Sequence, residues 1–161
     1  KDLLSSRIPF FRALFNSNML ECVKREINLS SQFCEFDFST FENLVEYAYT
    51  GCLTISVSNV QDIMMGASYL QIASVMDECS EFMISRMRID NVLSIFSFFE
   101  LIVYHEYDAP LLNFIDTNLI PISFTDDFLD LPVDNLITFI QRDSLYVDNE
   151  SQVFEIINRW I

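Results

Sequence analysis

The sequence has 161 residues, of which 51% are hydrophobic and only two are glycine. This length and composition exclude disordered and collagen-like chains, and they favour a mainly helical globular protein over a loop-rich β structure. The formal net charge of −15 disfavours nucleic acid as a partner, because phosphate binding relies on clustered Lys and Arg side chains.

The chain begins with short elements. Pro9 separates two short apolar patterns, at residues 3–4 and 11–15, and this predicts two short helices. Residues 23–29 then alternate between polar and apolar side chains, which is typical of a half-buried strand. Residues 30–38 are expected to form a connecting loop.

Two helices are predicted after this loop, with a short strand between them. Ser39 and Glu42 have the spacing of a capping box, and Gly51 supplies a stop for the helix that they begin. Residues 53–57 alternate as a second short strand, and residues 58–61 carry another capping box. The helical stripe that follows breaks near Gln71 and continues to residue 83.

The composition changes after Met87, and we place a domain boundary there, which gives domains at residues 1–88 and 89–161. Residues 1–88 carry seven basic and eleven acidic side chains, whereas residues 89–161 carry two and thirteen. The acidity of the second domain has two readings, a solvated surface or a field that steers a basic partner. The solvated surface is the preferred reading.

The second domain is predicted to be an array of antiparallel helix pairs joined by short loops, with only a brief strand pattern at residues 145–147. Capping acids and prolines mark its helix ends. These start and stop residues are Asp90, Asp108, Pro110, Pro121, Pro132 and Asp148.

The sequence offers no recognisable catalytic, cofactor or metal site. His105 is the only histidine and is expected to cap a helix or lie at the surface, and the Asp126–Asp127 pair is expected to begin a helix. The four cysteines contain no Cys-x-x-Cys pair, so no zinc site is predicted. Cys52 and Cys79 are expected to be reduced, packed thiols, which favours an intracellular protein.

No membrane association is predicted. The most apolar segment, residues 92–104, contains Glu100 and is shorter than the ~20 residues that a membrane-spanning helix requires. We expect the protein in the cytoplasm, with the nucleus or the cytoskeleton as alternatives. Because the chain begins with Lys1 and stops within a helical pattern, it is expected to be part of a longer protein.

Several motifs, taken together, resemble those of the Kelch-like family. Residues 3–15, followed by Met19-Leu20-Glu21, resemble the middle of that family's BTB domain. The remaining similar segments are residues 44–51, 59–60 with 67–71, and 79–82 for the BTB domain, and residues 91–95, 128–131 and 153–160 for the BACK domain that follows it. The resemblance covers essentially the whole chain.

The resemblance implies a mainly α fold with a small β-sheet: a BTB/POZ fold, incomplete at its N-terminus, and the N-terminal part of a helical BACK domain. The family's first strand, helix and strand pair would precede Lys1. Those elements normally supply much of the homodimer interface. The complete protein is therefore expected to be a homodimer, and a Kelch domain beyond Ile161 is expected to capture the substrate protein.

Kelch-like proteins act as non-catalytic adaptors that bind the N-terminal domain of cullin-3 and present substrates for ubiquitination by a cullin-RING ligase. The family's cullin motif is a hydrophobic residue, any residue, then Glu, and Met19-Leu20-Glu21 matches it. The resemblance implies that the cullin contact comprises Ala13, Leu14, Phe15, Met19, Glu21, Tyr69 and Gln71. For Phe15 and Tyr69, ordinary core packing is an equal alternative.

A second function is also open. BTB folds elsewhere serve as oligomerisation scaffolds in transcriptional or cytoskeletal complexes that have no role in ubiquitination, and fold alone does not decide between these functions. An enzymatic role would require a bound cofactor or a second histidine, and the sequence shows neither a cofactor motif nor a second histidine.

Overall fold

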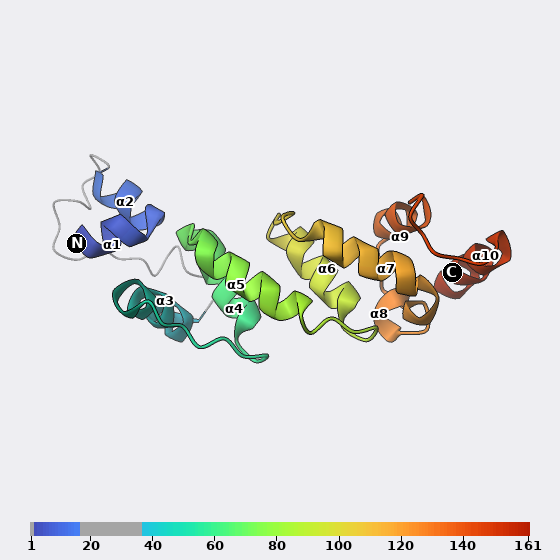
Figure 1. The fold of residues 1–161 in the computed structure, drawn as a ribbon, viewed down its shortest axis with the longest axis horizontal. Coiled ribbons are helices and arrows are strands. Elements are labelled where there is room, and N and C mark those ends of the chain that lie inside the picture. Colours follow the sequence, from blue (N-terminus) through green and yellow to red (C-terminus); the bar gives the residue numbers. More distant parts are fainter. Residues whose placement is uncertain (1, 17–36) are drawn as a thin grey trace. The chain divides into compact units, whose positions relative to one another are not determined.

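The computed structural model describes residues 2–16 and 37–161, and the regular elements in these residues are all helices. This confirms the mainly helical fold class. The chain divides into two compact units, Lys1–Phe82 and Met83–Ile161. In Figure 1 the first unit runs from blue to green and the second from green to red.

The first unit contains two short helices followed by longer ones. Pro9 begins the second helix, as predicted, because its fixed φ suits a first helical position. The helices are α1 (Asp2–Arg7), α2 (Pro9–Asn16), α3 (Phe38–Thr50), α4 (Val60–Leu70) and α5 (Ala73–Ile84). Helix α1 packs against α2 and α3, while α4 packs against α2 and α3.

The core of the first unit is built from the apolar stripes that the sequence indicated. Leu44 and Ala48 of α3 are buried one turn apart, as are Ile63 and Ala67 of α4. Phe11 is the buried residue of α2. Since each stripe faces the unit's interior, hydrophobic burial fixes how these helices pack.

Both α3 and α4 end at a residue with left-handed backbone. Gly51 follows α3 with φ 72°, and its N–H donates to the carbonyl of Tyr47 at 2.8 Å. Gln71 follows α4 with φ 59°, and its N–H donates to the carbonyl of Ser68 at 3.1 Å. The predicted stop at Gly51 and the predicted break at Gln71 are both confirmed, although only glycine adopts this backbone without steric cost.

The predicted capping boxes are wrong. Helix α3 begins at Phe38, before Ser39, and the hydroxyl of Ser39 donates to Asp37 instead. At α4 the cap residue is Asn59, whose side chain binds the preceding turn: its Oδ1 accepts from Ser56 N at 2.7 Å and its Nδ2 donates to Thr54 O at 3.0 Å. The Asn59 side chain therefore bonds the backbone of the preceding turn instead of capping the helix. Short polar side chains can make either kind of hydrogen bond.

Helix α6 begins in the same way. Asn91 accepts from Arg88 N at 2.8 Å and donates to Arg86 O at 3.1 Å, which repeats the contacts of Asn59 at identical sequence offsets. Asp90, the predicted cap, instead pairs with the guanidinium of Arg88 at 3.0 Å. Each asparagine therefore fixes the turn that leads into its helix.

Residues 53–57 do not form the strand that their alternating pattern predicted. They run without regular structure into the turn that Asn59 closes. A strand exists only when a neighbouring strand accepts its hydrogen bonds. The other strand predicted in this domain, residues 23–29, lies outside the described residues. Residues 145–147 likewise form no strand.

The second unit is an array of helices of unequal length. They are α6 (Val92–Leu101), α7 (Asp108–Ile122), α8 (Asp126–Leu129), α9 (Val133–Ile140) and α10 (Glu150–Trp160). Helix α6 packs against α7 and α8, α7 packs against α9, and α8 packs against α10. Asp126 begins α8 and Pro132 precedes α9, both as predicted.

Aromatic residues form much of this unit's core. Phe99, Phe128 and Phe139 are all fully buried. The ring of Phe139 meets that of Phe96 edge to face, with centroids 4.9 Å apart, and so joins α9 to α6. This packing links helices that are more than forty positions apart in the sequence.

Two helix ends in this unit differ from the prediction. Pro121 lies inside α7 rather than closing it, and the helix bends at Asn118, where φ is −126°. The proline lacks the N–H that would reach the carbonyl of Thr117, so the regular hydrogen bonding fails there. Helix α6 ends at Leu101, earlier than predicted, and Val103 adopts left-handed backbone with φ 52°.

Helix α10 is held at both ends by polar groups. At its start the cap is Asn149, rather than the predicted Asp148, and Asn149 accepts from Gln152 N at 3.3 Å. Near its end the indole of Trp160 donates to the carbonyl of Leu131 at 2.8 Å. Arg159 donates to Ser123 at 2.8 Å and lies over the ring of Phe124, 3.4 Å from its centroid.

Candidate partner-binding site

The predicted cullin contact is described by the structure in five of its seven positions. Ala13, Leu14 and Phe15 lie on α2, Tyr69 lies in the last turn of α4, and Gln71 follows that helix. Met19 and Glu21 lie outside the described residues.

Aromatic rings bring α2 against the end of α4. The ring of Phe10 lies 5.4 Å from that of Tyr69, between centroids, at an interplanar angle of 44°. Leu14 is one helical turn beyond Phe10 and so lies on the same side of α2. The two sequence segments that the prediction assigned to one contact are therefore neighbours in the fold.

Helix α2 is anchored by its other side. Phe11 is buried, stacks on Phe15 with centroids 5.7 Å apart, and approaches Phe41 of α3 at 6.4 Å. The guanidinium of Arg12 donates to the carbonyls of Ser5 and Ser6, both at 2.9 Å. These carbonyls belong to the last turn of α1, which a cation stabilises. No pattern in the sequence indicated this role of Arg12.

The predicted contact residues differ in how much of each is exposed to solvent. Ala13 and Gln71 are exposed, whereas Leu14, Phe15 and Tyr69 are half-buried. Phe15 stacks on the buried Phe11, so at least part of its surface supports α2. Leu14 and Tyr69 are thus partly accessible and adjoin the exposed positions 13 and 71.

The other candidate chemical groups do not assemble into a site among the described residues. No three His, Cys, Asp or Glu side chains gather there as a metal centre. His105 is exposed and its Nδ1 lies 3.0 Å from a carboxylate oxygen of Asp108, which agrees with the predicted surface role. No described helix is both long and apolar enough to cross a membrane.

Two cysteines lie in the part of the chain that the structure describes, and one of them differs from the prediction. Cys79 is buried and free, as expected, and burial together with the charge of Glu78 raises the pKa of its thiol to about 12. Cys52, which was also expected to be packed, is exposed. The turn that ends α3 at Gly51 places Cys52 beyond the helix and away from the core.

A small pocket of 160 Å³ lies in the first unit beside α1. This volume is below the about 300 Å³ at which sites for drug-sized ligands begin. Its lining residues are Arg7, Ile8, Tyr47, Ala48, Ile72 and Ser74.

Comparison with known proteins places both domains. Residues 1–87 match the model of the BTB/POZ domain, and residues 92–161 match that of the domain described as "BTB And C-terminal Kelch", or BACK. A zebrafish (Danio rerio) protein named Kelch repeat and BTB domain-containing protein 8 is 30% identical over 100% of this chain and 26% of its own length.

Further relatives carry Kelch-like names. Kelch-like protein 40 of Xenopus tropicalis is 32% identical over 98% of this chain and 25% of its own length. Human Kelch-like protein 6 is 28% identical over 99% of the chain and 25% of its own length. The chain thus spans about a quarter of the length of these relatives.

Proposed function

Because this chain belongs to the Kelch-like family of BTB–BACK proteins, we propose that it acts as an adaptor that binds the N-terminal domain of cullin-3 and recruits substrates for ubiquitination. The adaptor contributes surfaces rather than catalytic groups. The chemistry of ubiquitin transfer belongs to the ligase that it joins.

The proposed cullin contact is the surface made by α2, the segment that follows it, and the end of α4. Leu14 and Tyr69 supply apolar area, and Gln71 supplies a polar rim. Met19 and Glu21, outside the described residues, would add an apolar side chain and a carboxylate that fixes register by accepting hydrogen bonds.

The observation that carries this proposal is the contact of Phe10 with Tyr69. The family's pattern assigns cullin contacts to two segments more than fifty residues apart, and this ring pair joins those segments on one surface. One partner can therefore contact both segments at the same time, with apolar groups at the centre and polar groups at the rim.

In the whole protein we also propose a homodimer formed through the BTB domain and a substrate held by a Kelch domain. The name of the zebrafish relative, which includes a Kelch repeat, is consistent with this arrangement. We also propose a cytoplasmic location for the whole protein.

The test is calorimetric titration of the cullin-3 N-terminal domain into a protein that carries this chain with a complete BTB domain. We expect Glu21→Ala and Gln71→Arg each to weaken binding by at least about tenfold, since both alter the proposed contact. Gln61→Arg is the matched control, because it places the same side chain at the exposed start of α4. It lies about 15 Å along the helix from Gln71.

Binding by the unaltered protein and by Gln61→Arg, with weakened binding by the two site variants, would support the proposal. A folded protein without affinity for cullin-3 would refute it. If light scattering then shows a dimer, the scaffold function becomes the better explanation. Equal affinity of all variants would refute the contact surface while leaving the adaptor role intact.

A further inference from the structure

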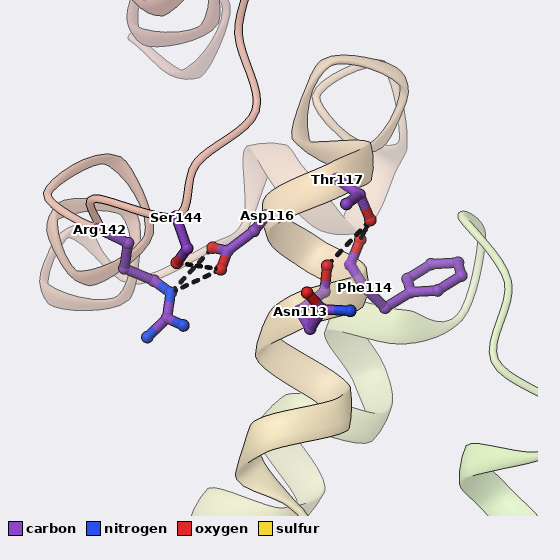
Figure 2. Close-up of polar contacts among 6 residues, drawn as sticks. All are labelled: Asn113, Phe114, Asp116, Thr117, Arg142 and Ser144. Carbon is purple, nitrogen blue, oxygen red and sulfur yellow. Dashed lines mark hydrogen bonds and ion pairs between the residues drawn. The ribbon is translucent and has the colours of Figure 1, made fainter.

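A buried carboxylate ties the segment between α9 and α10 to α7. The side chain of Asp116, 2% exposed, projects from α7 toward this segment, as Figure 2 shows. Arg142 Nε donates to both carboxylate oxygens, at 2.8 and 3.1 Å, and the hydroxyl of Ser144 donates at 2.6 Å. The N–H of Tyr146 donates to the carbonyl oxygen of Asp116 at 3.0 Å. We call these contacts the Asp116 latch.

The latch depends on both side-chain donors. An ionised carboxylate buried this deeply is stable only when charges and hydrogen bonds compensate for its lost hydration. Arg142 supplies the opposing charge, and Ser144 occupies a further lone pair of the carboxylate. A change that removes one donor and adds negative charge would therefore act on the whole latch.

Of the two side chains that bind the carboxylate of Asp116, Ser144 is the more accessible. It is exposed and lies outside regular structure, between the end of α9 and the start of α10. Arg142 stands two residues before it, and Asp143 beside it is exposed as well. A serine in an exposed, irregular segment with a nearby arginine can enter the extended binding groove of an arginine-directed protein kinase.

We propose that Ser144 is a phosphorylation site and that its phosphate releases the Asp116 latch. In the reaction the Oγ of Ser144 attacks the γ-phosphorus of ATP, an Oγ–P bond forms, and the bond to the bridging oxygen of ADP breaks. The hydroxyl proton passes to the base of the kinase, and ADP leaves. The product is a phosphoserine with a charge of about −1.5 to −2 at neutral pH.

The phosphate reverses the contribution of Ser144. The hydroxyl proton that bound Asp116 is lost, and a second negative group stands where the donor stood. Arg142 is two residues away and is attracted more strongly to the phosphate than to the singly charged carboxylate, because the phosphate carries the larger negative charge. Asp116 is then left buried without its partners, a state relieved when the segment leaves α7 and water enters.

The release would act on the approach to α10. Tyr146 lies four residues before Glu150, the first residue of α10, and its N–H bond to α7 is part of the latch. The contacts of Arg159 and Trp160 hold the other end of α10 independently. Phosphorylation is therefore expected to free residues 141–149 and the start of α10, while its last turn stays attached.

Two measurements on the full chain test the proposal. Incubation with an arginine-directed serine kinase and Mg-ATP, followed by peptide mass spectrometry, should find phosphate on Ser144 and none at this position in Ser144→Ala. Hydrogen exchange on the chain with phosphoserine encoded at position 144 should then show residues 141–149 exchanging at least about tenfold faster, the effect of losing a charge-assisted hydrogen bond.

Asp116→Asn is the diagnostic background. An amide at position 116 carries no charge and can donate to phosphate, so phosphoserine at 144 should leave exchange of residues 141–149 nearly unchanged relative to unmodified Asp116→Asn. The same acceleration by phosphoserine in both backgrounds would overturn the mechanism, as would unchanged exchange in the Asp116 chain. Absence of phosphate at Ser144 while other serines are modified would overturn the site itself.

Discussion

Val103 is the position where substitution by glycine is expected to stabilise the protein. It follows α6 with φ 52°, and the N–H of the next residue, Tyr104, reaches back to the carbonyl of Phe99 at 3.0 Å. This is the six-to-one hydrogen bond of a helix end that normally carries glycine in the left-handed position. A β-branched side chain there is a genuine steric outlier.

The magnitude follows from three terms. Left-handed strain costs a non-glycine residue about 1–3 kcal/mol, and the branched Cβ of Val103 places it in the upper half of that range. Val103 is 73% exposed, so truncation loses only about 0.5 kcal/mol of burial. Glycine's greater freedom in the unfolded chain costs roughly another 0.5–1 kcal/mol. We expect Val103→Gly to raise the unfolding free energy of the second unit by about 0.5–2 kcal/mol.

Urea unfolding followed by tryptophan fluorescence is the suitable assay, because Trp160 is the only tryptophan in the sequence and lies in the same unit as Val103. The midpoint should rise without a change in slope. Val103→Ala is the matched control. At an ordinary helical position alanine is more stable than glycine by about 1 kcal/mol, whereas at a left-handed position the order reverses. A more stable Val103→Ala would refute the reasoning.

Three further predictions concern buried groups. Arg142→Ala should destabilise the second unit by about 2–3 kcal/mol in the same urea assay, since it strands the charge of Asp116, and an unchanged midpoint would contradict this. Phe139→Ala should cost about 3–5 kcal/mol by opening a cavity against Phe96, with Phe139→Leu as the milder control. At pH 8 iodoacetamide should label Cys52 readily and Cys79 only after unfolding, because burial raises the pKa of the Cys79 thiol from 9.0 to about 12. Equal labelling of the two thiols would contradict their assignment. Because the folded state favours the protonated Cys79 thiol, the contribution of this thiol to the free energy of unfolding is complete below pH 9 and is lost between pH 9 and about 12.

The apolar stripes of the helices could be predicted from the sequence, because their three- and four-residue spacing is a local property. Pro9, Gly51 and Pro132 also marked helix ends correctly, since each restricts or relaxes its own backbone. The family motifs then indicated a BTB domain and a BACK domain, and comparison with known proteins confirmed both.

Other features were decided only by tertiary structure. Ser39 and Ser58 have the spacing of caps, yet Asp37 and Asn59 precede the helices, because neighbouring groups competed for the same polar side chains. Residues 53–57 have the alternation of a strand, but a strand also needs a neighbour to bind. The contact of Phe10 with Tyr69 joins segments distant in sequence, which no local pattern specifies.

The Asp116 latch shows the same division most clearly. In the sequence, Asp116, Arg142 and Ser144 are three polar residues spread over 29 positions, and none belonged to a recognised motif. Burial of Asp116 on the inner side of α7 disfavours its charge. The segment after α9 folds against it and supplies the hydrogen-bond donors and the positive charge that compensate. Local pattern thus determined which residues form helices and which side of each is buried. Long-range packing determined which polar groups became partners, because burial alone converts a weak surface attraction into an obligatory one.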